Sequence, residues 1–389
     1  MVAALAVNAV AFGTVYTFGT FFEAMATEFD TGLGPTSIVF GITLFLFFGT
    51  GAASGFLADR YGPRPLVFVG GALFSGGLFL TSQVEVLWHG YFTYGVGAGF
   101  GGGLFIAPLF AAVAGWTDRY RAIGQGVAAT GSGLGTLVLL PLANRLIERN
   151  GWRSAYVTLA VVAGVVFFLA GLAVDRPPVQ QAARAGRHLG AVLRTRSFRR
   201  LAIGAAMASA AQGSAFAFTV VFATDAGISS ARAALIVGVV GASSIVGRLL
   251  LTGLSNRIGP VRMLQLCFMG QPVAFAILLF AGSSYALLLG YAIVFGVAYG
   301  GFVALIGQVS AHLFGVRGLS MVLGWVYLAA ATGSLIYPPA VGFLADATTS
   351  NNGPKLAIIA VAALGSLYLL RLGPDPVPAD EMHAGPAVG

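Results

Sequence analysis

The chain of 389 residues has few charged side chains, four histidines and a single cysteine. Charged residues make up only 9% of it, whereas soluble domains contain about 25%. Hydrophobic residues make up 57%, and a soluble fold of this composition would expose large apolar patches. One cysteine, Cys267, excludes a disulfide framework, and four scattered histidines without acidic partners make no metal site. The composition indicates a helical membrane protein with many spans.

Motifs of soluble enzymes are missing or lie in the wrong context. GAGFGG at 97–102 fits the dinucleotide fingerprint, but it lies inside a long apolar run and follows no strand. The chain has no Walker lysine, and its TGS and GSG stretches offer no nucleophile with a base. The net charge of +8 is dispersed over short loops and one linker. We therefore expect no enzyme activity, no cofactor, and no binding of nucleotide or nucleic acid.

Apolar runs long enough to cross a bilayer, which takes about 20 residues, recur along the chain. We expect spans near 2–24, 37–58, 66–83, 87–115, 121–146, 153–174, 200–223, 231–254, 262–282, 284–314, 319–345 and 355–371. A basic, proline-containing segment at 175–199 divides the spans into two sets of six. The predicted organisation is an N-terminal bundle at 1–174, a cytoplasmic linker at 175–199, a C-terminal bundle at 200–371 and a cytoplasmic, disordered tail at 372–389.

The distribution of lysine and arginine predicts the orientation in the membrane. With a cytoplasmic N-terminus, fifteen of the 21 basic residues lie in inward loops, linker and C-terminus, and five lie in outward loops. Both termini are therefore predicted to be cytoplasmic, in the cell (plasma or inner) membrane. The remaining basic residue, Arg248, lies within an apolar span.

The two halves repeat one another. LADRYGP at 57–63 matches LSNRIGP at 254–260, GAGFGG at 97–102 matches GVAYGG at 296–301, and ATGS at 129–132 recurs at 331–334. Three matches at nearly one offset indicate a duplicated six-helix unit. Transporters with such repeats commonly bind substrate between the halves.

The stretch GFLADRYGPRP at 55–65 resembles the signature between the second and third helices of the major facilitator superfamily. The residues that fit it are Gly55, Asp59, Arg60, Gly62 and Arg64. YTFGTFF in the first span, RYRAIGQGVAATGSGLG at the fifth and IVGRLLLTGLSNRIG across the eighth together resemble the monocarboxylate porter group, which includes oxalate–formate exchangers. The resemblance implies an all-α membrane protein: 12 transmembrane helices in two six-helix bundles related by pseudo-two-fold symmetry.

The chain also departs from that group. The acidic residue usual in the second loop copy is Asn256, and the eleventh span has no cation. Asn8, Tyr16 and Ser244 stand near the positions of a lysine and an aspartate in the animal lactate carriers. Neither a second cationic substrate ligand nor an obvious proton-binding acid is therefore present in the spans.

Arg248 is the main candidate for substrate binding. An arginine in a membrane span costs about 2.5–3.5 kcal/mol on insertion scales, so it needs a reason. Snorkelling of the side chain to the interface is one reading. We favour the other, a clamp in which the guanidinium binds a carboxylate in a dry cavity, and the family resemblance agrees.

Uncharged polar residues of the spans are weaker candidates, because interhelical hydrogen bonds explain them equally well. The predicted substrate contacts besides Arg248 are Tyr16, Gln212, Tyr299, Asn8, Gln125 and Gln308. The resemblance implies a gate in which Asp59 pairs with a neighbouring helix end in the outward-open state; its predicted members are Asp59, Arg60, Arg64, Gly55, Gly62 and Arg257. Candidate proton sites are His312, His89, Glu23 and Asp225, for which an interfacial histidine or a solvated carboxylate is the alternative.

The sequence therefore predicts a monomeric secondary active transporter that moves a small organic anion, a monocarboxylate, across the lipid bilayer by alternating access, with proton coupling or exchange. Two alternatives remain open at this point. One is efflux of amphipathic drugs or other hydrophobic small molecules, and the other is a membrane sensor that binds without translocating.

Overall fold

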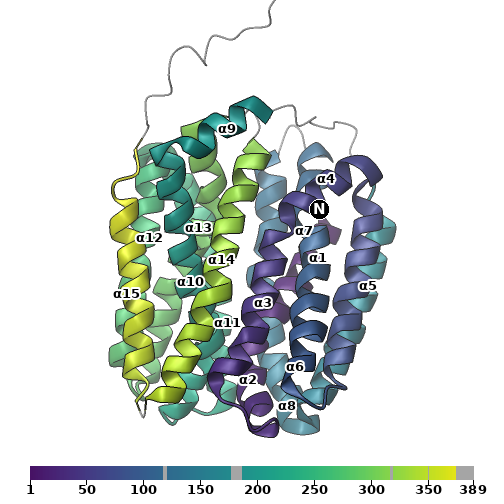
Figure 1. The fold of residues 1–389 in the computed structure, drawn as a ribbon, viewed down its shortest axis with the longest axis vertical. Helices are drawn as coiled ribbons and strands as arrows, with labels where there is room; N and C mark the ends of the chain where they lie inside the picture. The colour runs from purple at the N-terminus through teal and green to yellow at the C-terminus, as the bar shows by residue number, and fades with distance from the viewer. Residues whose placement is uncertain (117–120, 177–185, 316–318, 349, 374–389) are drawn as a thin grey trace, which may run out of the picture.

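The computed structural model describes residues 1–116, 121–176, 186–315, 319–348 and 350–373. These residues form helices and no strands. Figure 1 shows the helices standing side by side in two groups, one built from α1–α8 and the other from α10–α15. The predicted tail at 372–389 lies outside the described residues beyond Gly373.

The first half contains α1 (Val2–Tyr16), α2 (Phe18–Glu28), α3 (Leu33–Gly49), α4 (Gly51–Tyr61), α5 (Pro63–Thr81), α6 (Leu87–Gly90), the π-helix η1 (Tyr91–Ala98), α7 (Gly99–Trp116) and α8 (Arg121–Ala173). α8 has 53 residues, about 80 Å at 1.5 Å per residue, far more than one bilayer needs. Gly151, with φ of 79°, breaks it into two passes, because only glycine adopts this backbone without strain.

The linker contributes α9 (Gly186–Arg194). The second half contains α10 (Arg196–Asp225), α11 (Ser230–Ile258), α12 (Pro260–Ala281), α13 (Tyr285–Phe314), α14 (Leu319–Ala347) and α15 (Asn352–Leu369). Gly282, with φ of 50°, ends α12, so the short SS-containing break predicted between the ninth and tenth spans is confirmed.

The described helices make twelve passes, as the hydropathy pattern predicts. Ten stretches are long and apolar enough to span a membrane, and one of these, Gly126–Ala173, holds the two passes of α8. The remaining pass is α3 with α4, which is interrupted at Thr50 and is therefore shorter in its apolar part. α1 with α2, and α6 with η1 and α7, likewise act as single passes.

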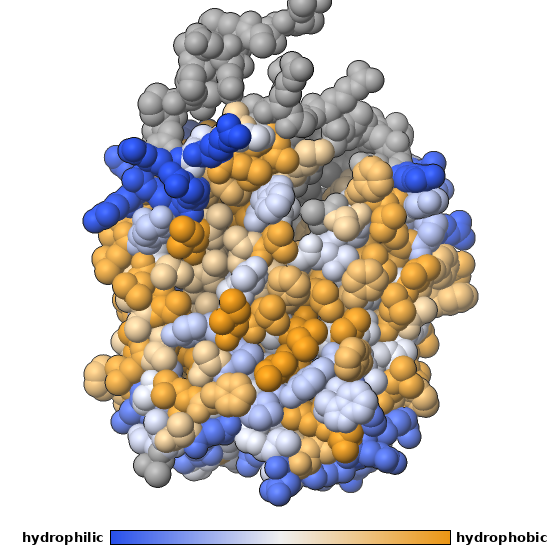
Figure 2. Space-filling model, in the orientation of Figure 1, coloured by the Kyte–Doolittle hydropathy of each residue, from blue (hydrophilic) through white to orange (hydrophobic). Residues whose placement is uncertain are grey.

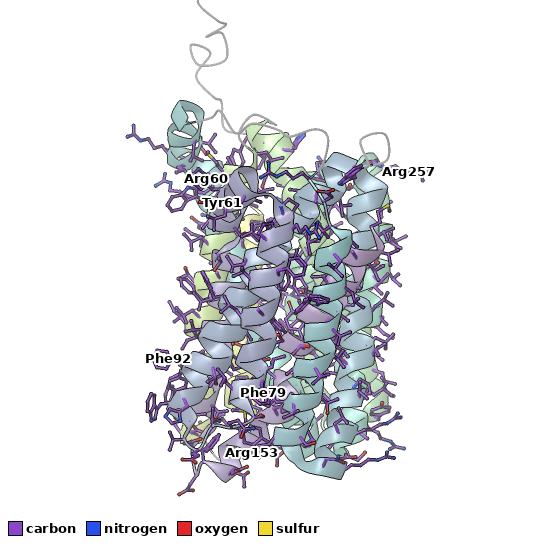
Figure 3. All side chains as sticks on the ribbon, turned by 90° about the vertical axis from the view of Figure 1, so that its right-hand side faces the viewer. Arg60, Tyr61, Phe79, Phe92, Arg153 and Arg257 are labelled. Carbon is purple, nitrogen blue, oxygen red and sulfur yellow. The ribbon has the colours of Figure 1, made fainter. Side chains whose placement is uncertain are left out.

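The surface has the polarity of a membrane protein. Figure 2 shows hydrophobic residues around the middle of the molecule and hydrophilic ones gathered at its two ends. Figure 3 shows Arg60, Tyr61 and Arg257 at one end and Arg153 at the other. We call the first the linker end, because α9 lies there, and the second the distal end (Figure 1).

Glycines allow the helices of each half to approach closely, and they do so in matched places. A Cβ at Gly131 in α8 would overlap the carbonyl oxygen of Leu5 in α1, and one at Gly135 would overlap the carbonyl oxygen of Ala9. In the second half, a Cβ at Gly333 in α14 would overlap the carbonyl oxygen of Ala206 in α10. These contacts fall in the recurring ATGSGLG and ATGSLIY stretches, so the duplicated sequence builds the same helix contact twice.

Gly135→Ala is expected to lower the apparent Tm of the purified protein. The added methyl group meets a backbone oxygen that has no room to move, and such overpacking costs about 1–3 kcal/mol. The matched control is Gly307→Ala in α13, where a Cβ meets nothing within 4 Å. Thermal unfolding of both variants, followed by intrinsic fluorescence, checks this; equal Tm values would contradict the close approach of α1 and α8.

Candidate functional site

Arg248 reaches from the second half to the first. Its side chain is 6% exposed on α11, and its Nη1 donates hydrogen bonds to the carbonyl oxygen of Ala129 and, at 2.6 Å, to Oγ of Ser132, both in α8. The two helices meet through Gly241 and Gly133, where a Cβ on either would lie 2.6–2.7 Å from the carbonyl oxygen of the other. The arginine is therefore held at the contact between the halves and does not extend to the linker-end surface, as snorkelling would require.

The Nε donor of this guanidinium is unused. Nε of Arg248 is buried and has no hydrogen-bond partner among the described residues. A buried donor without an acceptor costs about 1–3 kcal/mol, and more when it is charged. The free donor therefore marks a place where an acceptor, above all an anion, would be stabilised.

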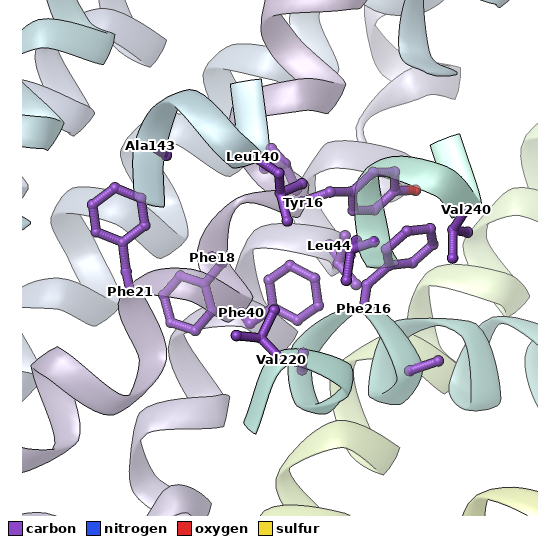
Figure 4. Packing of buried hydrophobic residues seen from close by; sticks show 14 of the residues in the cluster. Tyr16, Phe18, Phe21, Phe40, Leu44, Leu140, Ala143, Phe216, Val220 and Val240 are labelled. Carbon is purple, nitrogen blue, oxygen red and sulfur yellow. The ribbon is translucent and has the colours of Figure 1, made fainter. Parts of the chain in front are cut away.

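Aromatic rings from both halves form a wall beside Arg248. The Tyr16 ring of α1 stacks on Phe216 of α10, with centroids 4.0 Å apart and planes 7° from parallel (Figure 4). The Tyr16 hydroxyl lies 2.8 Å from the Tyr299 hydroxyl of α13, a hydrogen bond across the halves. The Arg248 guanidinium carbon lies 6.0 Å from the centroid of the Tyr299 ring, within range of a cation–π interaction.

Two further buried amides have unused hydrogen-bonding atoms. Asn8 donates to the carbonyl oxygen of Ala4 at 2.8 Å, but its Oδ1 has no described partner. It packs against Gly131 in α8, between the two α8 residues that bind Arg248. Gln212 is 5% exposed, its Nε2 is also without a described partner, and it lies one turn before Phe216 on the same face of α10. The structure thus brings the predicted residues Arg248, Tyr16 and Tyr299 together, with Asn8 and Gln212 on adjoining turns.

The other two predicted substrate contacts are not part of this cluster. Gln308 is exposed, and its Oε1 accepts a hydrogen bond from Ser255 at 3.1 Å. Ser255 lies about 10 Å along α11 from Arg248, towards the linker end. Gln308 therefore joins α13 to α11 there. The side chain of Gln125 lies outside the described residues.

The predicted gate residues lie at the linker end. Arg60 and Arg64 are exposed and lie over the rings of Tyr61 and Phe68, at 5.3 and 6.0 Å. Gly62 has φ of 88° and makes the turn from α4 to α5. The other three members are Gly55, where a Cβ would meet nothing within 4 Å; Arg257, which is exposed in the last turn of α11; and Asp59, whose side chain lies outside the described residues.

The four candidate proton sites are at the ends of the molecule and do not face Arg248. His312 is exposed in the last turn of α13, and Glu23 is exposed on α2. His89 is half-buried against Trp88, with ring centroids 4.1 Å apart. Asp225 is exposed and accepts a hydrogen bond from Asn351 at 2.8 Å. No group of three metal-ligating side chains occurs within the ranges that the structure describes.

Sequence reasoning missed three contributors: Ser132, the carbonyl oxygen of Ala129, and Phe216. Ser132 belongs to the recurring ATGS stretch, and Phe216 lies one helical turn from Gln212, so both had a weak signal. The carbonyl had none, since a helical carbonyl accepts a second hydrogen bond only where another helix comes close.

Known proteins resemble the chain along nearly all of its length. The sequence model of the Major Facilitator Superfamily matches residues 4–281 and 201–386. Monocarboxylate transporter 3 of Rattus norvegicus is 30% identical over 368 residues, covering 89% of this chain and 73% of the relative. Monocarboxylate transporter 11 of Homo sapiens is 28% identical over 364 residues, covering 89% and 76%.

Solved structures share the fold. A bacterial homologue of the human lysosomal transporter Spinster, in an inward-facing and occupied conformation, superposes with a TM-score of 0.74 at 15% identity, covering 95% of both chains. The xylose transporter XylE of E. coli, in a partially occluded inward-open conformation, gives 0.72 at 16% identity, covering 96% of this chain and 97% of its own.

A small carboxylate is expected to raise the Tm of the wild-type protein and to have no such effect on Arg248→Lys. A ligand at 100 times its Kd stabilises the folded state by about 2.7 kcal/mol. Lysine cannot give this effect, because its single ammonium group lacks the paired N–H donors that a guanidinium offers to a carboxylate. Thermal unfolding in a panel of small carboxylates and sugars measures this. The control is Arg199→Lys on the exposed start of α10, which should keep the wild-type response. Equal stabilisation of both variants by the carboxylate would show that Arg248 does not bind it.

Proposed function

The chain belongs to the major facilitator superfamily, and on that premise we propose that it is a secondary active transporter of a small monocarboxylate. Members of this superfamily are transporters and not enzymes, and the many apolar helices make the chain a multi-pass membrane protein. Lactate-, pyruvate- and glyoxylate-like acids are the substrates that we expect.

The observation that carries this proposal is the buried guanidinium between the halves with an unused donor. A carboxylate presents two acceptor oxygens, and Arg248 offers a positive charge and a free Nε–H in a setting from which water is largely excluded. Electrostatic attraction is stronger there than at a surface. The named relatives, monocarboxylate transporters, agree with an acid of this kind.

The neighbouring groups fit a small acid with a short apolar or hydroxylated remainder. Tyr16, Phe216 and Tyr299 supply aromatic surface, and Gln212 and Asn8 supply one donor and one acceptor. A second cation would be needed to balance a dicarboxylate, and Arg248 faces none among the described residues. A single carboxylate is therefore the better match.

The position of the site supports alternating access. Substrate held by Arg248 would touch α8 of one half and α11 and α13 of the other, so binding favours a state in which the halves close around it. We place both termini in the cytoplasm of a cell-membrane protein, with bundles at 1–174 and 200–371, because the basic residues concentrate at the linker end.

The proposed mode of coupling rests on the lack of a partner acid beside Arg248 among the residues that the structure describes. None of the candidate proton sites faces Arg248, so we propose exchange of one acid for another, or co-transport of a proton taken up outside the Arg248 site. The alternative function is efflux of hydrophobic compounds, which the aromatic rings of Tyr16, Phe216 and Tyr299 would bind. It does not use the buried charge, and large aromatic residues such as Phe56, Phe92 and Phe280 are exposed on the surface of the protein.

Arg248→Lys in proteoliposomes is expected to lower saturable counterflow of radiolabelled lactate and pyruvate about tenfold or more. Lysine keeps the charge but lacks the paired N–H donors of a guanidinium, and a lost hydrogen bond to a charged group costs about 1.5–3 kcal/mol. Arg199→Lys should transport as wild type, and an unchanged Tm shows that each variant is folded.

Near-normal transport by Arg248→Ala would refute the clamp. Drug resistance on overexpression that is insensitive to substitution of Arg248 would support efflux, and binding of acids without any counterflow would support a sensor.

A further inference from the structure

An aspartate of the second half caps a helix of the first half at the distal end. Oδ1 of Asp346, in the last turn of α14, accepts a hydrogen bond from the backbone N–H of Leu33 at 2.7 Å, and Oδ2 accepts one from Gly34 at 2.8 Å. These are the first two N–H groups of α3, which lack partners within their own helix, and no side chain of the α3 N-terminus caps them. The carboxylate also faces the positive end of the helix dipole.

Glycines on both sides shape this contact. A Cβ at Gly342 in α14 would lie 2.8 Å from the carbonyl oxygen of Leu33, so a side chain there would push the two helices apart. A Cβ at Gly32 would overlap the Asp346 carboxylate, and one at Gly34 would overlap the ring of Phe343. The carboxylate therefore reaches the N–H groups because three positions carry no side chain.

Other charged contacts at the distal end stay within one half. Glu28 accepts hydrogen bonds from Trp152 and Arg153, all in the first half. Asp225 accepts one from Asn351, both in the second half. Asp346 differs from these, in the part of the chain that the structure describes, because its hydrogen bonds cross from one half to the other.

The sequence around Asp346 occurs a second time. GFLAD stands at 342–346 and also at 55–59, where it ends in Asp59. The copy at 342–346 lies at the distal end of α14, and the copy at 55–59 lies near the end of α4 that is at the linker end. α14 packs along α3 and reaches α4, so the two copies lie at opposite ends of one pair of neighbouring passes. Asp346 thus lies at the end of α14 that is near the start of α3, and Asp59 lies at the end of α4 that is near the start of α14.

We propose that Asp346 is the distal latch of the transport cycle, the counterpart of Asp59 at the linker end. With Asp346 on the N-terminus of α3, the two halves are held together at the distal end, as the hydrogen bonds of this structure show. When the distal side opens, Asp346 releases the two N–H groups of α3. This inference rests on the proposed alternating access, but it concerns only the movement of the halves and involves no substrate.

The test measures the distance between the halves without substrate. Spin labels are attached at Asn150→Cys in the first half and Ser283→Cys in the second, both exposed at the distal end, in a Cys267→Ala background in nanodiscs. Asp346→Ala is expected to enlarge the long-distance population about fivefold, the usual effect of losing a helix cap. Asp346→Asn, which keeps one acceptor, should have an intermediate effect, and Asp59→Ala should reduce the same population. The matched control, Asp225→Ala, removes a distal carboxylate whose hydrogen bond stays within one half, and should leave the distances unchanged.

A second variant opens the latch without touching the carboxylate. Gly342→Ala should enlarge the long-distance population as Asp346→Ala does, which keeps the proposal testable should Asp346→Ala fail to fold. Unchanged distances in Asp346→Asn and Gly342→Ala, or an equal change in Asp225→Ala, would overturn the latch. A failure of the carboxylate proposal would appear instead in the counterflow of Arg248→Lys, which this measurement does not use.

Discussion

The charge of Arg248 has to be kept in a region that offers almost no water, and much of the arrangement around it follows from that requirement. The cost of burying a guanidinium falls when oxygen acceptors are close, and α8 supplies two of them, one from its backbone. That approach is possible because glycines line the contact between α8 and α11. The buried position of Arg248 therefore depends on the close packing of α8 against α11. The hydrogen bonds of Arg248 in turn connect the two halves.

The aromatic wall acts on the same interaction. Tyr16, Phe216 and Tyr299 occupy space that water would otherwise enter, and the Tyr16 and Tyr299 hydroxyls share a hydrogen bond across the halves. Nε of the guanidinium has no acceptor among the described residues and is available to a ligand. A site of this kind binds through one strong charge interaction and several weak contacts, so its selectivity among small acids depends on the shape of the aromatic surface.

The sequence predicts the passes well and the contacts between halves poorly. Hydropathy locates each pass because a bilayer demands an apolar run of nearly fixed length, and the repeats reveal the duplication because both halves keep the same close helix contact at Gly131 and Gly333. Arg248 stood out because a charge in a span is costly. Ser132, Phe216 and Asp346 did not, since serine and phenylalanine are ordinary in membrane helices and a loop-proximal aspartate is ordinary at a surface. Their importance comes from what faces them across the two halves. Gln308 lies apart from the Arg248 cluster because it accepts a hydrogen bond from Ser255 on α11 of the same half, a partner that spacing in the sequence does not reveal.

The docking of α9 limits how far the halves can separate. Val192, Leu189 and Leu193 pack with Phe198 in the hydrophobic cluster of the second half, so α9 travels with that half. Arg176, in turn, donates a hydrogen bond to the carbonyl oxygen of Arg60 in the first half. Each half therefore holds one described end of the linker, Arg176 on the first half and α9 on the second. The linker thus joins the halves through a packed contact on each side and not through the peptide bonds alone.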